Sequence, residues 1–190
     1  MMRVVKFNKA HFTDMLAIAF ENNQSANYIV QQDRKRGQRI KRLMAYAHVV
    51  CERCGKVLTT VDGYSCALIL FPDQKEFSLS TLVLDLKLIL GVIGIQNPFK
   101  VLRIEKLINQ QHSEKFIYYL WFIAVDPKHQ GEGMGTELLK KLIADANSMQ
   151  RSFYLETLTL KNISWYQKPG FQIYDELDIG YRLYFLKHLT

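Results

Sequence analysis

The sequence predicts an α/β fold in which a mixed, mostly antiparallel sheet of about seven strands is flanked by helices. An unbroken apolar and aromatic run at 118–125 fits a strand covered on both faces, as in the parallel part of a mixed sheet. A helical segment and a further apolar strand at 152–160 follow, an order that requires a parallel crossover. Hairpins at 56–71 and 171–186 supply antiparallel strands.

Length and composition indicate one globular domain over residues 1–190. The chain is 48% hydrophobic and 12% aromatic, and no Pro/Ser-rich linker divides it. Its formal net charge of +7 suggests an anionic ligand, which a phosphate-bearing cofactor or a nucleic acid would satisfy equally well.

Membrane and metal functions are not expected. The first residues lack the apolar core of a signal peptide, and the most apolar stretch, at 82–95, is too short and too charged to span a bilayer. We therefore expect a soluble, cytoplasmic protein with no membrane partner. Cys51 and Cys54 form a CxxC pair and Cys66 stands apart, but nothing at suitable spacing completes a zinc site, so reduced thiols and no metal are expected.

The N-terminal half is predicted to be mainly helical. In chain order the expected elements are a strand at 3–7, helices at 11–21, 26–32 and 38–52, and hairpin strands at 56–60 and 64–71 joined by Asp62-Gly63. The segment 77–115 then reads as mainly helical, with Gly91, Gly94 and Pro98 interrupting it. It either packs against the sheet or lines an acceptor pocket.

The densest charge cluster in the chain is the basic run at 34–42. It is interpreted as a solvated helix face opposite an apolar stripe. Attraction of an anionic cofactor or an acidic substrate is the second interpretation. Nucleic-acid binding is the third, and few aromatic residues lie among these charges to support it.

A glycine loop, Gln130-Gly-Glu-Gly-Met-Gly135, joins the strand at 118–125 to an amphipathic helix at 135–149. Alternating glycines let the backbone approach a ligand, and the first amides of the helix suit a phosphate or pyrophosphate, although a simple turn would look the same. The loop lacks the lysine of a Walker loop, and its third glycine comes one residue too early for a dinucleotide fingerprint.

Gln-x-x-Gly-x-Gly after a strand that ends Val-x-Pro resembles the GNAT superfamily of N-acetyltransferases, as does the downstream segment Asn162-Ile-Ser-Trp-Tyr-Gln-Lys-Pro-Gly-Phe171. The resemblance covers roughly Tyr118 to Asp175. It implies acetyl-CoA as co-substrate and a parallel strand pair that splays apart at the cofactor cleft. It also implies direct attack, in a ternary complex, by the primary amine of a small molecule or peptide.

The resemblance assigns the cofactor contacts. They are main-chain groups of Ile123 and Val125 for the pantetheine arm, and Gln130 with the amides of Gly131, Gly133, Met134, Gly135 and Thr136 for the pyrophosphate. Asn162 would either bind the cofactor arm or cap a short helix at 162–168.

Two residues are candidates for proton transfer. Tyr166 matches the tyrosine that protonates the departing thiol in this family, and a phenol pKa near 10 lies close to a thiol pKa near 8.5. A packed aromatic residue is the alternative. Glu156 is the candidate base that deprotonates the ammonium through water, with His112, Glu105 and Glu114 as rivals.

The leading function is therefore acetyl-CoA dependent N-acetyl transfer. A non-catalytic acetyl-CoA sensor or interaction module is the alternative from another class, and a nucleic-acid binder that uses 34–42 is a third. A homodimer stays open, as does the identity of the acceptor.

Overall fold

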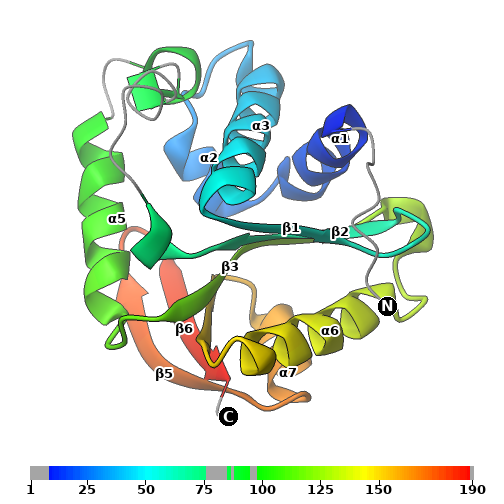
Figure 1. Ribbon diagram of the computed structural model, residues 1–190. Helices are drawn as coiled ribbons and strands as arrows, with labels where there is room; N and C mark the ends of the chain where they lie inside the picture. The colour runs from blue at the N-terminus through cyan, green and yellow to red at the C-terminus, as the bar shows by residue number, and fades with distance from the viewer. Residues whose placement is uncertain (1–8, 76–84, 87, 95–97, 189–190) are drawn as a thin grey trace.

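The computed structural model describes residues 9–75, 85–86, 88–94 and 98–188, which form a sheet with helices on both faces (Figure 1). Within them, six strands follow the order β1-β2-β3-β4-β6-β5, and β3–β4 is the one parallel pair. The strands are β1 Gly55–Thr59, β2 Ser65–Leu70, β3 Ile117–Val125, β4 Ser152–Thr157, β5 Phe171–Asp178 and β6 Arg182–His188. The predicted mixed sheet is confirmed, while the strand expected at 3–7 lies outside the described residues.

The helices are α1 Lys9–Phe20, α2 Gln24–Ile29, α3 Arg36–Cys54, α5 Pro98–Gln111, α6 Met134–Ser148 and α7 Leu160–Gln167, with shorter turns η1 Pro72–Gln74, η2 Ile89–Ile93 and η3 Pro127–His129. Helices α1 to α3 lie over one face of the sheet and α6 over the other (Figure 1). Pro98 begins α5, because the first helical turn needs no proline N–H. Within the described ranges, no helix combines the length and apolarity that a bilayer span requires.

A β-bulge in β3 changes which way its side chains face. Leu120 and Phe122 pair with adjacent residues of β2, so Trp121 is an extra residue in β3. By simple alternation Leu120 and Phe122 would share a face. Instead Leu120 packs in the cluster beneath α6, and Phe122 packs in the cluster beneath α1 and α3. After the bulge, the side chains of β3 therefore point to the opposite face of the sheet from the one that simple alternation predicts.

The parallel pair separates at the same point. Residues 117–120 of β3 pair with residues 152–155 of β4, and the described pairing between these two strands ends there. Beyond it, the rest of β3 pairs with β2, and Glu156 and Thr157 pair with β6. The predicted splay is confirmed, and it leaves main-chain groups along the inner edges of β3 and β4.

A buried arginine holds the other end of this pair together. Arg151, 8% exposed, donates to both carboxylate oxygens of Asp73 at 2.6 and 2.9 Å and to the main-chain oxygen of Ile117 at 3.1 Å. Its guanidinium lies 4.4 Å from the ring centroid of Phe71. Hydrogen bonds from Arg151 also hold the pKa of Asp73 below its usual range.

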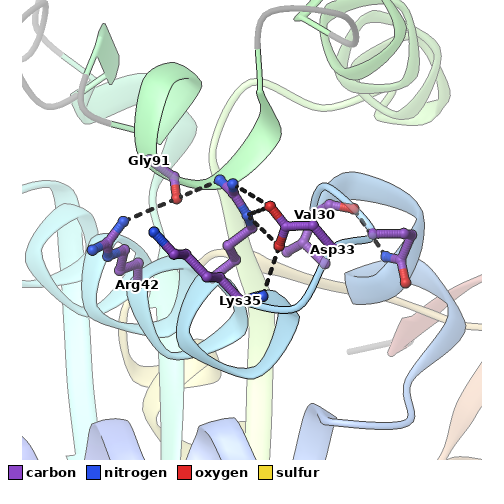
Figure 2. A network of polar contacts seen from close by, with 7 residues as sticks. Val30, Asp33, Lys35, Arg42 and Gly91 are labelled. Carbon is purple, nitrogen blue, oxygen red and sulfur yellow. Dashed lines mark hydrogen bonds and ion pairs between the residues drawn. The ribbon is translucent and has the colours of Figure 1, made fainter.

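Several arginines of the basic run at 34–42 form hydrogen bonds with other segments of the fold, and Figure 2 shows part of this network. Arg39 donates to Asp33 at 2.7 Å and to the main-chain oxygen of Gly91 at 3.0 Å, and Arg42 donates to the same oxygen at 3.3 Å. Arg36 donates at 2.7 Å to the main-chain oxygen just after α1. The interpretation as a solvated face is therefore wrong for Arg39, whose side chain is 12% exposed, and these arginines connect the start of α3 to η2 and α1.

Arg151→Met is expected to lower the free energy of unfolding by about 2–4 kcal/mol, because it leaves Asp73 partly buried without its cation. A carboxyl whose pKa is lowered in the folded state contributes stability above its unfolded pKa and loses it as pH falls. The wild type should therefore lose this contribution to its free energy of unfolding below about pH 4. The variant, which lacks the contribution, should not show this loss. Urea unfolding at pH 7 and at pH 3 measures both effects.

Arg182→Met is the matched control, because Arg182 and Glu176 lie 3.8 Å apart with side chains 58% and 54% exposed. A change within about 0.5 kcal/mol is expected there. Equal losses in the two variants would contradict the role assigned to Arg151.

Candidate active site

The turn of the β1–β2 hairpin supports the entry to the glycine loop. The backbone N–H of Asp126 donates to the main-chain oxygen of Tyr64 at 2.8 Å, and the Asp126 carboxylate accepts from the backbone N–H of Lys128 at 2.9 Å. The ring of Tyr64 stacks on that of His129, with centroids 3.8 Å apart and planes 15° apart. The loop therefore leaves β3 in a fixed direction.

The three glycines of the loop serve two different purposes. Gly131 and Gly133 have φ angles of 89° and 84°, which side-chain-bearing residues rarely adopt. A Cβ at Gly135 would instead lie 3.3 Å from Val125 and 3.4 Å from the Trp165 ring. Two glycines thus set the backbone conformation, and the third lets α6 approach β3 and α7 closely.

The start of α6 presents unpaired amides. Its N-cap is Gly133, which has no side chain to cap the helix, and the backbone N–H of Glu137 donates to the Gly133 oxygen. The amides of Met134, Gly135 and Thr136 belong to the first turn, so they have no acceptor within the helix and carry the positive end of its dipole. This arrangement fits a pyrophosphate.

The polar side chains of the loop are compatible with an anion. Gln130 is exposed, and its side-chain nitrogen lies 3.5 Å from the main-chain oxygen of Val125. Glu132 is 52% exposed, and its carboxylate lies 3.2 Å from Nδ1 of the His129 ring, so it has a polar neighbour within the loop.

A direct hydrogen bond connects the loop to α7. The indole N–H of Trp165 donates to the Thr136 hydroxyl at 2.9 Å, and the same indole ring packs against Tyr166 with centroids 4.7 Å apart. The predicted phosphate-binding turn and the predicted proton donor are therefore joined through one side chain. Sequence reasoning missed this connection, because the two residues lie 29 positions apart.

A cavity of about 180 Å³ lies where β3 and β4 separate. Four predicted site residues line it: Ile123, Glu156, Asn162 and Tyr166. The remaining predicted cofactor contacts, at Val125 and along 130–136, lie outside the cavity wall, at the end of β3 and in the loop. Residues of α5 also line the cavity, as expected if 77–115 contributes to an acceptor pocket.

Tyr166 lies in the last turn of α7 and is 5% exposed. It packs between Trp165 and Phe171, so it is at once a core aromatic and part of the cavity wall. Burial raises the pKa of Tyr166 above its ordinary value. The phenol therefore stays protonated at neutral pH, but the expected near match to a thiol pKa does not hold for the buried side chain.

Glu156 follows the last β4 residue that pairs with β3, and its side chain is 7% exposed. The carboxylate lies 3.2 Å from Nε2 of His112, whose side chain is 6% exposed and whose ring packs on Tyr119 and Tyr154. Burial first, and then the Glu156 charge and hydrogen bond, raise the pKa of Tyr119. The structure thus pairs Glu156 with one of its predicted rivals.

The other two rivals lie elsewhere. Glu105 forms an exposed ion pair with Lys75 at 3.0 Å. Glu114 accepts hydrogen bonds from Lys187 and Ser152, and Lys187 in particular lowers the pKa of this carboxyl. Neither glutamate is among the residues that line the cavity, so Glu156 is the better placed base.

Asn162 does not cap α7. The helix begins at Leu160 after its N-cap Thr159, which places Asn162 inside the first turn. Asn162 is exposed and lines the cavity, so contact with a bound ligand is the interpretation that fits.

The described residues contain no group of three or more His, Cys, Asp or Glu side chains arranged to hold a metal ion. Cys51, Cys54 and Cys66 are buried and free. Burial raises the pKa of the Cys66 thiol to about 12, so it is not a reactive nucleophile.

Comparisons with known proteins agree with this geometry. Residues 89–173 match the family described as an acetyltransferase (GNAT) domain. No curated protein matches the chain by sequence. A histone acetyltransferase HPA2 and related acetyltransferase from Corynebacterium glutamicum shares the fold with a TM-score of 0.71 at 18% identity, over 98% of this chain and 93% of its own. An N-acetyltransferase from Staphylococcus aureus shares it with a TM-score of 0.57 at 13% identity, over 94% of each chain.

Gly133→Ala is expected to weaken binding of coenzyme A about tenfold. A Cβ at this positive φ costs roughly 1–2 kcal/mol, and the loop can relieve that strain by leaving the conformation that aligns the α6 amides. Isothermal titration with coenzyme A measures the dissociation constant.

Gly37→Ala in α3 is the control, because a Cβ there meets nothing within 4 Å and the residue is helical. It should leave the affinity unchanged. Unaltered affinity in Gly133→Ala as well would show that the loop does not bind the cofactor.

Proposed function

We propose that this chain, whose residues 89–173 match the acetyltransferase (GNAT) domain family, moves an acetyl group from acetyl-CoA to the primary amine of an acceptor in the cavity beside Glu156. Acyl transfer from acetyl-CoA is the chemistry of the family. Attack by the amine within a ternary complex and the residue roles below are the proposal. The observation that carries it is that Glu156 and Tyr166 line the same cavity, at the point where β3 and β4 separate.

The residues around the glycine loop fit acetyl-CoA. The amides of Gly131, Gly133, Met134, Gly135 and Thr136, with the side chain of Gln130, would hold the pyrophosphate. Main-chain groups of Ile123 and Val125 lie on the part of β3 that has left β4, and with Asn162 they would bind the pantetheine arm. Once bound, the cofactor supplies the acetyl thioester. The contribution of these contacts is to hold the thioester in position for attack.

Glu156 accepts the proton that the acceptor must lose. An amine is protonated at neutral pH and becomes a nucleophile only as the free base. The buried carboxylate can take this proton directly or through a water, and His112, 3.2 Å away, can share it. Overall, a carbon–nitrogen bond replaces a carbon–sulfur bond and the nitrogen loses two protons. Glu156 passes one of them to solvent, and the other makes up for the proton that Tyr166 gives to the departing sulfur.

Tyr166 holds the proton that the departing sulfur needs. Its raised pKa keeps the hydroxyl protonated until the thiolate forms. The Trp165 contact to Thr136 supports the alignment of this helix with the cofactor loop. A purely cofactor-sensing module would need neither a buried carboxylate nor a phenol in the cavity wall, so these two side chains favour catalysis.

The acceptor is proposed to be a small molecule or a peptide that carries a primary amine. We also propose that residues 1–190 form one acetyltransferase domain, which the alignment over 98% of the chain supports. A cytoplasmic location is proposed because the described cysteines are unpaired thiols.

Tyr166→Phe should lower kcat by about tenfold or more while leaving the affinity for coenzyme A nearly unchanged, because it removes an interaction made only in the transition state. Thiol release from acetyl-CoA in the presence of an amine measures kcat. Tyr184→Phe, at a tyrosine outside the cavity wall, should keep the wild-type rate. A wild-type rate in Tyr166→Phe would remove the assigned role.

Glu156→Gln should lower kcat/KM at neutral pH by about a hundredfold, because the acceptor then loses its proton only to solvent. The remaining rate should rise with pH as more free amine becomes available. The pH–rate profile measures both effects. Glu105→Gln, which changes the exposed rival, should behave as wild type. An unaltered pH–rate profile in Glu156→Gln would exclude Glu156 as the base.

A further inference from the structure

The cavity wall combines aromatic and aliphatic side chains with a smaller number of polar ones, among them Asn23, Ser25, Thr157 and Thr159, and its residues come from every layer of the fold. Phe20 from the end of α1 packs edge-on against Phe122 of β3, with centroids 5.0 Å apart. Ile104 and Ile108 of α5 and Leu183 of β6 complete the wall away from α7. A cavity of this composition binds an apolar body and uses a few polar groups to orient it.

Glu156 is the one fully charged side chain among the described residues that line the cavity. The carboxylate is 7% exposed, and its neighbour His112 balances its charge only when the imidazole is protonated. A buried carboxylate strongly prefers a cation beside it. An ammonium is therefore favoured at this position, and a second carboxylate on the acceptor would be repelled in a poorly solvated space.

A hydrophobic cluster lies at one side of the cavity. The ring of Tyr181, which lines the cavity, meets that of Tyr28 from α2 at 5.3 Å, nearly perpendicular. Ile108 from α5, with Leu177 and Ile179 from the β5–β6 hairpin, packs in the same cluster. This side of the cavity therefore offers an acceptor aromatic and aliphatic surface.

The volume matches a compact acceptor. An engineered apolar cavity of about 150 Å³ holds one benzene molecule. At about 180 Å³, this cavity must also take the acetyl thioester beside Tyr166, so it limits the acceptor to at most a single ring or a branched alkyl group with a short arm to its amine.

We propose that the acceptor is an apolar primary monoamine, with an aromatic or branched alkyl body among the aromatic and aliphatic walls and its ammonium toward Glu156. This inference rests on the proposed acetyl transfer and narrows its acceptor class. It excludes amino acids, whose carboxylate would approach Glu156, and it favours a ring or a branched alkyl body over the unbranched side chain of a peptide lysine.

A matched acceptor series tests the inference with the wild-type protein and acetyl-CoA. The probes are 2-phenylethylamine, phenylalanine, which has the same body with a carboxylate added, and a short lysine peptide with a blocked N-terminus. We expect kcat/KM for 2-phenylethylamine to exceed that for the other two by about a hundredfold. Equal or greater activity on phenylalanine or the peptide overturns the acceptor class and leaves acetyl transfer intact. Transfer to none of the three overturns the acceptor class as well.

The thermal shift with acetyl-CoA distinguishes a failure of the acceptor class from a failure of the proposed function. A protein that is not stabilised by acetyl-CoA and acetylates no amine refutes the proposed function itself. A protein that is stabilised and acetylates only phenylalanine or the lysine peptide refutes the acceptor class alone.

Ile108→Trp provides an independent test, because the half-buried Ile108 faces the cavity and a larger side chain there shortens it. The variant should lose about tenfold or more in kcat/KM for 2-phenylethylamine, lose much less for ethylamine, and keep the wild-type thermal shift with acetyl-CoA. Leu102→Trp on the same helix is the control, since Leu102 is 59% exposed and lies outside the cavity wall. Equal losses for both amines in Ile108→Trp would contradict the assignment.

Discussion

The extra residue at Trp121 is the constraint on which the site depends. Upstream of it, β3 is a regular parallel partner of β4, and Arg151 fastens that end through Asp73 and the Ile117 oxygen. Downstream, the side chains of β3 point to the opposite faces of the sheet, and within the described residues the strand pairs only with β2. A sheet that stayed fully paired would fill this space with main-chain hydrogen bonds. The bulge instead lies where the described pairing between β3 and β4 ends, and the cavity occupies the opening between the two strands.

The two halves of the proposed chemistry are joined through α6 and α7. Positive φ angles at Gly131 and Gly133 turn the chain so that the first amides of α6 remain available to an anion. Gly135 allows Trp165 to reach Thr136, and Trp165 packs against Tyr166. The placement of a phosphate group and the placement of a proton donor are consequently set by one continuous packed unit.

The sequence predicted the features that depend on neighbours in the chain. The Asp62-Gly63 hairpin, the glycine loop and the helix after it carry local signals, and the structure confirms them. The splayed strand pair is expected from the family resemblance, and the strand pairing agrees with it. The seventh strand, at 3–7, stays a prediction. Contacts between distant segments could not be read in the same way. The pairing of His112 with Glu156, the approach of α5 to the cavity and the bonds of Arg39 to Gly91 arise from tertiary packing, which composition and periodicity do not encode.

The most direct test of the account is the position of the coenzyme A sulfur in a crystal structure of the complex. If the loop and the splayed strands act as described, the pyrophosphate lies on the amides of residues 131–136. The sulfur then lies within hydrogen-bonding reach of the Tyr166 hydroxyl, roughly 3–4 Å away. A cofactor that binds elsewhere, or a sulfur that lies well beyond that distance on the far side of β3, would contradict the account.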